Sequence, residues 1–550
     1  MNINIANPTM ELFDCWDKWF LDEKHGCWCL EDVLYTDKAN VPKFQRLSIF
    51  VPKALMNPDG MPTEASRSVS VVFENNSAGY MQMPHTWLDG PRCYAEQYLN
   101  HGLVYVTCGC RGRDSVDKLG QFVGKSPISL VDLKTALRFL RHNREALPGN
   151  WDRVISVGWS AGGAMSALLG VTGDNPRYDK YLKDNGAFMD ESDAVFAAQI
   201  YCPIVDLEHA DLAYEWCFGA DRECEDSPAG PAETMTPFKE ALSKGLARKY
   251  VEYVNGLGLK HPETGEALTL NADGRCGRFY DYLMNCLSDS ATDFLTRLST
   301  GILPQKYSVE DYLTGNYTYE APAPMPPAAH HAGGDVALPD KPLSLGELVS
   351  RPPKGQEATV MKPPMEKRRG KDKRAWLSWD GERATITGLD AYVLNHRRRM
   401  KPCTSFDKLD MDSGENQEFG NSTVDYVHFN PAIGEAIRSL SGQFPDEAKR
   451  IEGAFDVSGD AALAERVFLI NPMNYIGTGE KSRQAEYFRI RLGASDADTS
   501  FSVAMTLAVK LQNAGIPVDF AFVWDRPHSE ADYPGEVLEW IDAITKEAAK

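Results

Sequence analysis

Residues 154–170 read VISVGWSAGGAMSALLG, and this stretch decides the fold prediction. Four strand-forming residues lead into the pentapeptide GWSAG at positions 158–162, and a run of small residues with helical character follows. A strand that turns sharply into a helix presents the middle residue of the turn, here Ser160, above the sheet, while flanking glycines keep Cβ atoms away from the strained backbone. The helix N-terminus behind the turn favours negative charge beside the hydroxyl. The stretch therefore predicts that Ser160 is a nucleophile.

Strand-like and helix-like segments alternate over the first two hundred residues, which is typical of an α/β fold with parallel strands. In the helix before the serine stretch, we expect Ser126 to be the N-cap and Pro127 the first helical residue. Together with the serine turn, this order predicts an α/β-hydrolase fold. The expected strands are 47–51, 68–73, 103–107, 154–157, 195–201, 487–492 and 518–523, and the expected C-terminal helices are 501–514 and 537–548.

The alternation stops after Cys202 and resumes near residue 485, and this gap is too long for a loop in a compact domain. We interpret the gap as a large inserted cap (lid) domain whose two ends return to the sheet. The expected organisation is 1–205 and 485–550 as the two parts of the hydrolase core, with 206–484 as the cap. Pro-rich loops are expected near 321–375, and the basic run KRRGKDKR at 367–374 is interpreted as a solvated loop.

The composition limits the classes of partner. The chain of 550 residues has a formal net charge of −20, which argues against nucleic acid and anionic membrane as main partners because both need a basic face. The 12 cysteines include C-x-C spacings and show no zinc, haem or disulfide pattern. Acidic residues stand near the N-terminus where a secretion signal would be apolar, and no apolar run approaches the ~18 residues of a membrane helix. We therefore expect a cytoplasmic protein that needs no metal and no cofactor.

A serine hydroxyl needs a base to take its proton, and the base needs an acid to orient it. In α/β-hydrolases these partners follow the serine in the order Asp or Glu, then His, after later strands. His528 is the only histidine after residue 428 and follows the strand at 518–523, so it is the expected base. The preceding strand is followed by both Asp496 and Asp498, and spacing alone does not choose between them.

The same reasoning predicts an oxyanion hole made of two backbone N–H groups. One is expected from Ala161, which follows the nucleophile. The second is expected from the loop NNSAGY at 75–80, where Gly79 has no Cβ to hinder the approach of a carbonyl.

At this point the chain resembles the bacterial tannases, tannin acyl hydrolases of the α/β-hydrolase superfamily. The resemblance extends over most of the length and is carried by long blocks rather than by a single pentapeptide. These blocks are RGRDSVDKLGQFVG from Arg111, GWSAGGAMSALLG from Gly158, YCPIVDLEHADLAYEW from Tyr201, MKPCTSFDKLDMDSGEN from Met400, RIRLGASDADTSF from Arg489 and VDFAFVWDRPHSEADY from Val518.

The resemblance implies a serine esterase that cleaves galloyl esters of hydrolysable tannins and simple gallate esters through an acyl-enzyme. It implies Ser160 as nucleophile, Asp496 as triad acid and His528 as base. It further implies that Lys401 and Glu415 from the cap, with Asp498 from the sheet side, hold the phenolic hydroxyls. Two departures stand out: the family's Gly-Gly-Tyr in the oxyanion loop is Ala-Gly-Tyr at 78–80, and the segment near 300–390 is longer, more Pro-rich and more basic than is usual in the family.

Other functions remain open at this stage. A feruloyl-type or general carboxylesterase, or less readily a serine peptidase, would use the same triad, and a binding protein with a decayed site would not retain all three members. Lys401, Glu415 and Asp498 separate these hypotheses, because an acyl group with one hydroxyl or none would not need three ionic partners. The expected partner is a small phenolic ester, and the sequence leaves the oligomeric state open.

Overall fold

A nine-stranded sheet forms the centre of the protein. The computed structural model describes residues 18–90, 94–224, 232–303, 307–316 and 376–548, so the expectations for the Pro-rich and basic segments near 321–375 lie outside the described residues. The strand order is β1-β2-β3-β5-β4-β6-β7-β12-β13. The strands are β1 (Phe20–Asp22), β2 (Cys27–Leu34), β3 (Arg46–Pro52), β4 (Ser70–Asn76), β5 (Val104–Gly109), β6 (Asn150–Trp159), β7 (Ala197–Tyr201), β12 (Tyr487–Gly493) and β13 (Val518–Val523).

The sheet is parallel from β5 to β13, and only the edge formed by β1, β2 and β3 runs antiparallel. All seven strands expected from the sequence are present, whereas β1 and β2 were not predicted. The strand order and pairing confirm the predicted α/β architecture with a mostly parallel sheet. Parallel strands place their carboxyl ends at one edge of the sheet, where loops carry the functional groups of open α/β folds.

Helices complete the α/β unit. Helix α3 packs on β6 and β7, and α15 packs on β12 and β13. The prediction that Ser126 caps α2 is wrong, because Pro127 occupies the cap position and the Ser126 hydroxyl donates instead to the Arg466 carbonyl, 2.8 Å away. The helices of this part are α1 (Ala95–Asn100), α2 (Ile128–His142), α3 (Ala161–Val171), α4 (Asp179–Asp184), α15 (Phe501–Asn513) and α16 (Glu536–Glu547).

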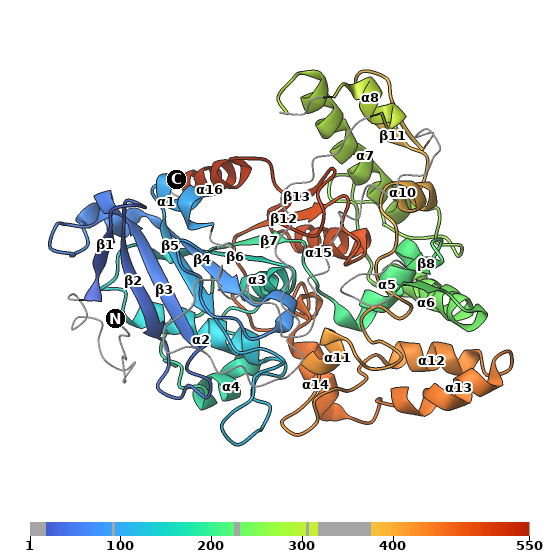
Figure 1. The fold of residues 1–550 in the computed structure, drawn as a ribbon, viewed down its shortest axis with the longest axis horizontal. Coiled ribbons are helices and arrows are strands. Elements are labelled where there is room, and N and C mark those ends of the chain that lie inside the picture. Colours follow the sequence, from blue (N-terminus) through green and yellow to red (C-terminus); the bar gives the residue numbers. More distant parts are fainter. Residues whose placement is uncertain (1–17, 91–93, 225–231, 304–306, 317–375, 549–550) are drawn as a thin grey trace, which may run out of the picture.

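The chain leaves the sheet after β7 and returns at β12, and these two strands are hydrogen-bonded neighbours. The intervening helices gather on the right in Figure 1, beside the sheet. They are α5 (Leu207–Phe218), α6 (Pro237–Gly256), α7 (Arg278–Ser299), α8 (Val309–Thr314), α10 (Leu389–Asn395), α11 (Gly414–Glu418), α12 (Pro431–Ser439), α13 (Pro445–Ile451) and α14 (Ala461–Leu469). Two small hairpins, β8 (Glu223–Cys224) with β9 (Glu233–Thr234) and β10 (Leu377–Trp379) with β11 (Ala384–Ile386), complete this inserted region.

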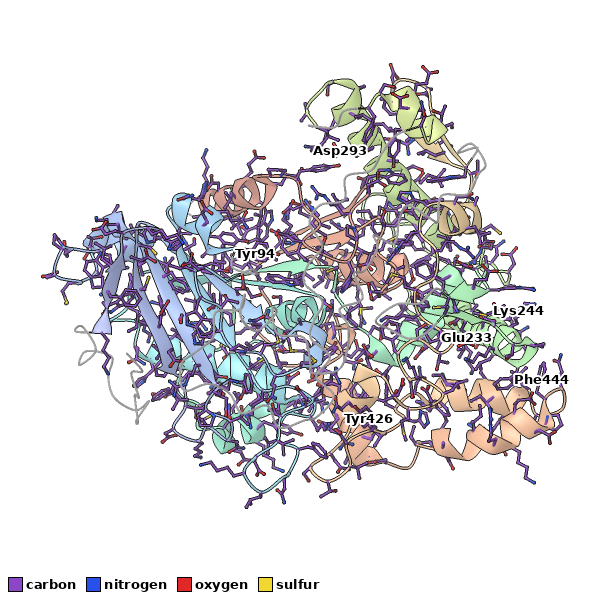
Figure 2. All side chains as sticks on the ribbon, in the orientation of Figure 1. Tyr94, Glu233, Lys244, Asp293, Tyr426 and Phe444 are labelled. Carbon is purple, nitrogen blue, oxygen red and sulfur yellow. The ribbon has the colours of Figure 1, made fainter. Side chains whose placement is uncertain are left out.

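One hydrophobic core extends from the sheet into the inserted helices, and side chains fill both parts (Figure 2). Helix α5, at the start of the insertion, packs on both α6 and α15. The inserted region is therefore anchored on the sheet side by apolar contacts. Within the described residues, no helix is both long and apolar enough to cross a membrane.

Candidate active site

The expected turn between strand and helix is formed at the junction of β6 and α3. Ser160 occupies it with φ 60° and ψ −127°, a conformation that L residues adopt only under constraint from their surroundings. The constraint is visible in the hydrogen bonds, since the Ser160 N–H donates to the Tyr201 carbonyl at 3.1 Å and the Ser160 carbonyl accepts from the Ile204 N–H at 3.2 Å. A Cβ on Gly158 would lie 2.2 Å from the Gly162 carbonyl oxygen, so the turn excludes any larger residue there.

A continuous chain of hydrogen bonds links the three residues expected to form a triad. His528 Nε2 lies 2.8 Å from Ser160 Oγ, and His528 Nδ1 lies 2.7 Å from Asp496 Oδ2. The residues follow β6, β12 and β13, so the carboxyl edge of the sheet brings them together. Asp498 makes no such contact with the ring, and its N–H donates to Asp496 Oδ1 at 2.8 Å. The geometry thus distinguishes the two aspartates that spacing left equivalent.

Electrostatics at the triad favour a proton on the imidazole. Burial opposes the charged ring, but Asp496, Cys202 and Asp498 outweigh this effect and raise the pKa of His528 well above its ordinary value. Burial likewise opposes ionisation of Asp498, yet His528 and Lys401 lower the pKa of that carboxyl. A ring that holds a proton strongly is suited to accept one from a hydroxyl and pass it to a leaving group.

The two expected oxyanion donors occupy positions that leave their N–H groups available. Ala161 is the first residue of α3, where N–H groups have no carbonyl partner within the helix. Gly79 lies in the short turn η4 (Ala78–Tyr80) with φ 62°. Within the protein a Cβ on Gly79 would meet only the Met81 Cγ, at 3.8 Å. The positive φ, rather than crowding by neighbouring residues, therefore accounts for a glycine here.

Asn75 is a functional candidate that the sequence reasoning missed. It is the penultimate residue of the fully buried strand β4, and its Nδ2 donates to the Val157 and Gly162 carbonyls at 3.0 and 3.1 Å, on both sides of the serine turn. Its Oδ1 accepts from the Ser77 hydroxyl at 2.8 Å, at the entrance to η4. One amide therefore joins the nucleophile turn to the oxyanion loop. The signal available in the sequence was the polar run ENN at the end of an otherwise apolar strand.

The three groups expected to hold phenolic hydroxyls come from three places. Lys401 is 9% exposed, and its Nζ lies 4.0 Å from the centre of the Phe406 ring. Glu415 is on α11, which packs against η4. In the described part of the chain, none of the head groups of Lys401, Glu415 and Asp498 forms an ion pair with another residue. Lys401 is close enough to Asp498 to lower the pKa of the Asp498 carboxyl. Among the described residues, no hydrogen bond joins Glu415 to Lys401 or to Asp498.

Cys202 was not singled out from the sequence, yet its sulfur lies beside the triad. Its Sγ and the ligand atoms of Asp496 and His528 all lie within 4.8 Å of one another. A second group, Asp206 with Glu208 and His209, has the same spacing. Such groups can hold a metal, but the first is accounted for by the triad hydrogen bonds and the second by the Asp206–His209 pair at 2.8 Å. The expectation that no metal or cofactor takes part stays a prediction.

Comparisons with known proteins identify the family of the chain. A family model described as BD-FAE matches residues 119–215, a range that includes Ser160, and no curated protein sequence matches the chain. The native structure of tannin acyl hydrolase from Lactobacillus plantarum is 30% identical, with a TM-score of 0.71 and coverage of 94% of each chain. A tannin acyl hydrolase in complex with ethyl gallate is 30% identical, with a TM-score of 0.70 and 94% of each chain covered. The tannase of Fusobacterium nucleatum is 27% identical, with a TM-score of 0.71, covering 94% of this chain and 95% of that one.

The alignment with the Lactobacillus plantarum enzyme covers 94% of the chain at 30% identity, so it includes both the sheet and the inserted region. The BD-FAE match adds an independent indication of an esterase with the α/β-hydrolase fold. Both the fold prediction and the resemblance stated from the sequence are confirmed. This chain belongs to the tannase (tannin acyl hydrolase) family of the α/β-hydrolase superfamily and is a carboxylic ester hydrolase.

Proposed function

We propose that the protein hydrolyses galloyl esters, both in hydrolysable tannins and in simple gallate esters, through a covalent acyl-enzyme. The observation that carries this proposal is the unbroken hydrogen-bonded chain Ser160–His528–Asp496 with ionic groups nearby that have no ion-pair partner of their own. The tannin acyl hydrolase that binds ethyl gallate, with 94% of both chains aligned, supports it further. The boundaries 1–205, 206–484 and 485–550 belong to the proposal, with the inserted region acting as the cap.

In this mechanism His528 Nε2 accepts the proton of Ser160 Oγ as the oxygen attacks the ester carbonyl carbon. The N–H groups of Ala161 and Gly79 stabilise the oxyanion, and Asp496 holds the ring in the tautomer that can accept the proton. The tetrahedral intermediate collapses, the bond to the alcohol oxygen breaks, and His528 protonates the leaving alcohol. Water then repeats the sequence on the galloyl ester of Ser160, releasing gallic acid and restoring the hydroxyl.

Recognition of the acyl group is assigned to Lys401, Glu415 and Asp498. A trihydroxyphenyl ring presents adjacent donors and acceptors, which two carboxylates and an ammonium satisfy together. Asp498 is near both His528 and Lys401, which supports a ring site next to the reacting carbonyl. Glu415 reaches the same region from α11, against the oxyanion loop.

A feruloyl-type esterase is the second candidate function, and the BD-FAE match over residues 119–215 favours it. That range contains the nucleophile turn and stops before Lys401, Glu415 and Asp498, so it bears on the reaction and not on the acyl group. A ring with a single free hydroxyl would leave some of the three ionic groups desolvated and unpaired. We therefore rank galloyl esters first.

The test is a comparison of kcat/KM for the methyl esters of gallate, protocatechuate, ferulate and benzoate. The wild type should cleave methyl gallate up to roughly 10⁴ times faster than methyl benzoate, with protocatechuate between them, because a site built for hydroxyls rejects a ring that lacks them. Lys401→Met and Glu415→Gln should flatten this series chiefly by slowing gallate.

Lys408→Met is the matched control, since Lys408 is a neighbouring lysine that pairs with Asp412 at 2.8 Å instead. It should leave the series unchanged. Equal rates for gallate and benzoate in the wild type would leave a general carboxylesterase, and a preference for ferulate would establish the second candidate.

A further inference from the structure

The segment that follows β5 is fixed rigidly to helix α2. Arg111 is 3% exposed, and its Nε and Nη2 donate to the two oxygens of Asp132 at 3.0 and 2.7 Å. Asp132 is fully buried on α2. A two-pronged arginine–carboxylate pair of this kind sets both distance and orientation. The residues directly after Arg111 therefore leave the core from a fixed base.

This segment packs backbone to backbone against the oxyanion loop. A Cβ on Gly112 would lie 2.1 Å from the Met81 carbonyl carbon, so nothing larger than glycine fits between the two chains. The Arg113 N–H donates to the Tyr80 carbonyl at 2.7 Å, and the Gln82 N–H donates to Asp114 Oδ1 at 2.7 Å. The far side of the oxyanion loop is thus held by the 111–114 segment.

The side chain of Arg113 continues this contact to the proposed oxyanion donor. Its Nε donates to the Gly79 carbonyl at 2.8 Å. Glycine has the widest range of backbone conformations, so the direction of the peptide groups around Gly79 depends on external contacts. The guanidinium supplies one contact on Gly79, and the Tyr80 N–H supplies another by donating to the Ser77 carbonyl at 3.0 Å.

The other end of the same guanidinium contacts the inserted region. Arg113 Nη1 donates to Gln417 Oε1 on α11, the helix that carries Glu415. A Cβ on Gly414, the first residue of α11, would lie 3.1 Å from Arg113 Cζ, so the helix begins directly against the guanidinium.

Further hydrogen bonds connect the two ends of the Arg113–Gln417 contact in a closed ring. Gln417 Nε2 donates to Asp425 Oδ1 at 3.1 Å, and Lys125 Nζ donates to the same oxygen at 2.5 Å. Lys125 Nζ also donates to the Arg113 carbonyl at 2.7 Å, and this bond completes the ring at Arg113. Tyr426, labelled in Figure 2, marks where the segment of Asp425 lies beside the inserted helices. Arg113 and Gln417 are therefore each held by further hydrogen bonds, to Lys125 and Asp425 respectively.

We infer that Arg113 is a positioning residue that orients Gly79 for the oxyanion and ties it to helix α11. Through this link, the oxyanion donor Gly79 and the ring-binding helix α11 keep a fixed position relative to each other. The ring-recognition half of the inference rests on the proposed function, whereas the oxyanion half applies to any ester that the enzyme cleaves.

The test compares Arg113→Gln, Gln417→Met and the double variant on two esters, p-nitrophenyl acetate and methyl gallate. Arg113→Gln should lower kcat for both esters by about 10- to 100-fold with little change in KM for the acetate, since misplacing one oxyanion donor acts on the transition state. Gln417→Met should lower kcat/KM about tenfold for methyl gallate and about twofold for the acetate, because only the galloyl ring reaches α11. The double variant should be no slower on methyl gallate than Arg113→Gln alone, because both changes cut one link.

Arg67→Gln is the matched control. Arg67 also clamps backbone carbonyls, those of Arg144, Glu145 and Leu147, at a site away from the triad, so its loss affects stability and not kcat. Arg113→Lys, which retains the charge but cannot reach two acceptors, should show the same kcat effect if Arg113→Gln does not fold. Unchanged kcat for the acetate in a folded Arg113 variant, or additive losses in the double variant, would overturn the inference. Failure of the wild type to cleave methyl gallate would overturn the proposed function instead, and the acetate arm would still decide the role of Arg113.

Discussion

The proposed catalytic centre and the proposed ring-binding groups differ in whether their charged side chains have partners in the protein. Asp496 and His528 are satisfied by each other and by Ser160, at distances of 2.7 and 2.8 Å. Lys401 and Glu415, from the inserted region, form no ion pair with any described residue. The three groups after β6, β12 and β13 are therefore ordered before any ester binds, whereas Lys401 and Glu415 keep charges that, in the proposed function, the ligand satisfies.

A second lysine shows how unusual this is for a buried ammonium group. Lys134 on α2 is fully buried, and its Nζ pairs with Asp193 at 2.6 Å and donates to the Thr172 carbonyl at 2.7 Å. Lys401 is nearly as buried, but among the described residues its Nζ has no ion-pair partner and lies over the ring of Phe406. A cation over an aromatic face offsets part of the desolvation cost and leaves the N–H donors available. The contrast supports the proposal that Lys401 serves recognition, whereas Lys134 is paired within the fold.

Replacing the proposed nucleophile should have the largest effect, because it should abolish catalysis and leave ligand binding unchanged. Ser160→Ala should lower kcat by roughly 10⁴-fold or more, while titration of gallate into the variant should give a dissociation constant close to that of the wild type. Ser529→Ala is the control, because this residue is next to His528 and its hydroxyl donates to the Pro527 carbonyl at 3.4 Å. A variant that keeps a tenth of wild-type turnover would remove Ser160 from the reaction.

The two aspartates should respond differently to the same conservative change. Asp496→Asn should lower kcat by about 10³- to 10⁴-fold on every ester with KM little changed, because His528 is then held in the wrong tautomer. Asp498→Asn should lower kcat/KM for methyl gallate far more than for methyl benzoate. The two variants are each other's control, and identical losses across both esters would contradict the division of labour.

Asn75 should matter to the catalytic centre and not to recognition. Asn75→Ala removes the amide that joins the serine turn to the oxyanion loop, so kcat should fall by about 10- to 100-fold for gallate and acetate esters alike. Asn76→Ala is the matched control, since the adjacent amide donates to the Pro84 carbonyl at 2.7 Å. A loss confined to gallate esters would place Asn75 with the ring-binding groups instead.

The smallest expected effect is a change in pH dependence. His528 must be neutral to accept the Ser160 proton, so kcat/KM rises with pH through the pKa of this ring. Asp498 is one of the groups that raise that pKa, so Asp498→Asn should move the acid limb to lower pH, by roughly half a unit or more. The measurement uses p-nitrophenyl acetate, which has no ring hydroxyls, with Asp519→Asn on the exposed edge strand as control. A limb that stays in place or moves upward would contradict the assignment.

The sequence predicted most strands of the sheet and proposed Ser160 and His528 for the triad, because the strand–turn–helix pattern and the chain order can be read without the fold. GWSAG between a strand and a helix is a local pattern, and chain order with the absence of a competing histidine pointed to His528. The N-terminal strand β2 escaped prediction because Glu31 and Asp32 interrupt its apolar run, at the place where its pairing with β3 is irregular. Capping of α2 by Ser126 was wrong because a tertiary partner, the Arg466 carbonyl, took the hydroxyl.

The supporting groups had weaker signatures or none. The polar run ENN marked Asn75, but Arg113 and Gln417 are separated by 304 positions. No periodicity or spacing reports such a contact, so only the folded chain reveals it. The choice between Asp496 and Asp498 was likewise open from spacing, because a shift of two residues along a loop decides which carboxylate faces the imidazole.

The distance in sequence between Ser160 and His528 also has a consequence for how the enzyme matures. The two residues are 368 positions apart, and β12 and β13 follow the inserted region in the chain. At translation rates of about 5–20 residues per second, roughly 20 to 70 s separate the synthesis of the serine from that of its base. Over that interval the nascent chain carries a nucleophile with no base, so it cannot acylate itself on esters in its surroundings. The onset of ester hydrolysis therefore requires β12 and β13 to have paired beside β7, and it can serve as a clock for that step of folding.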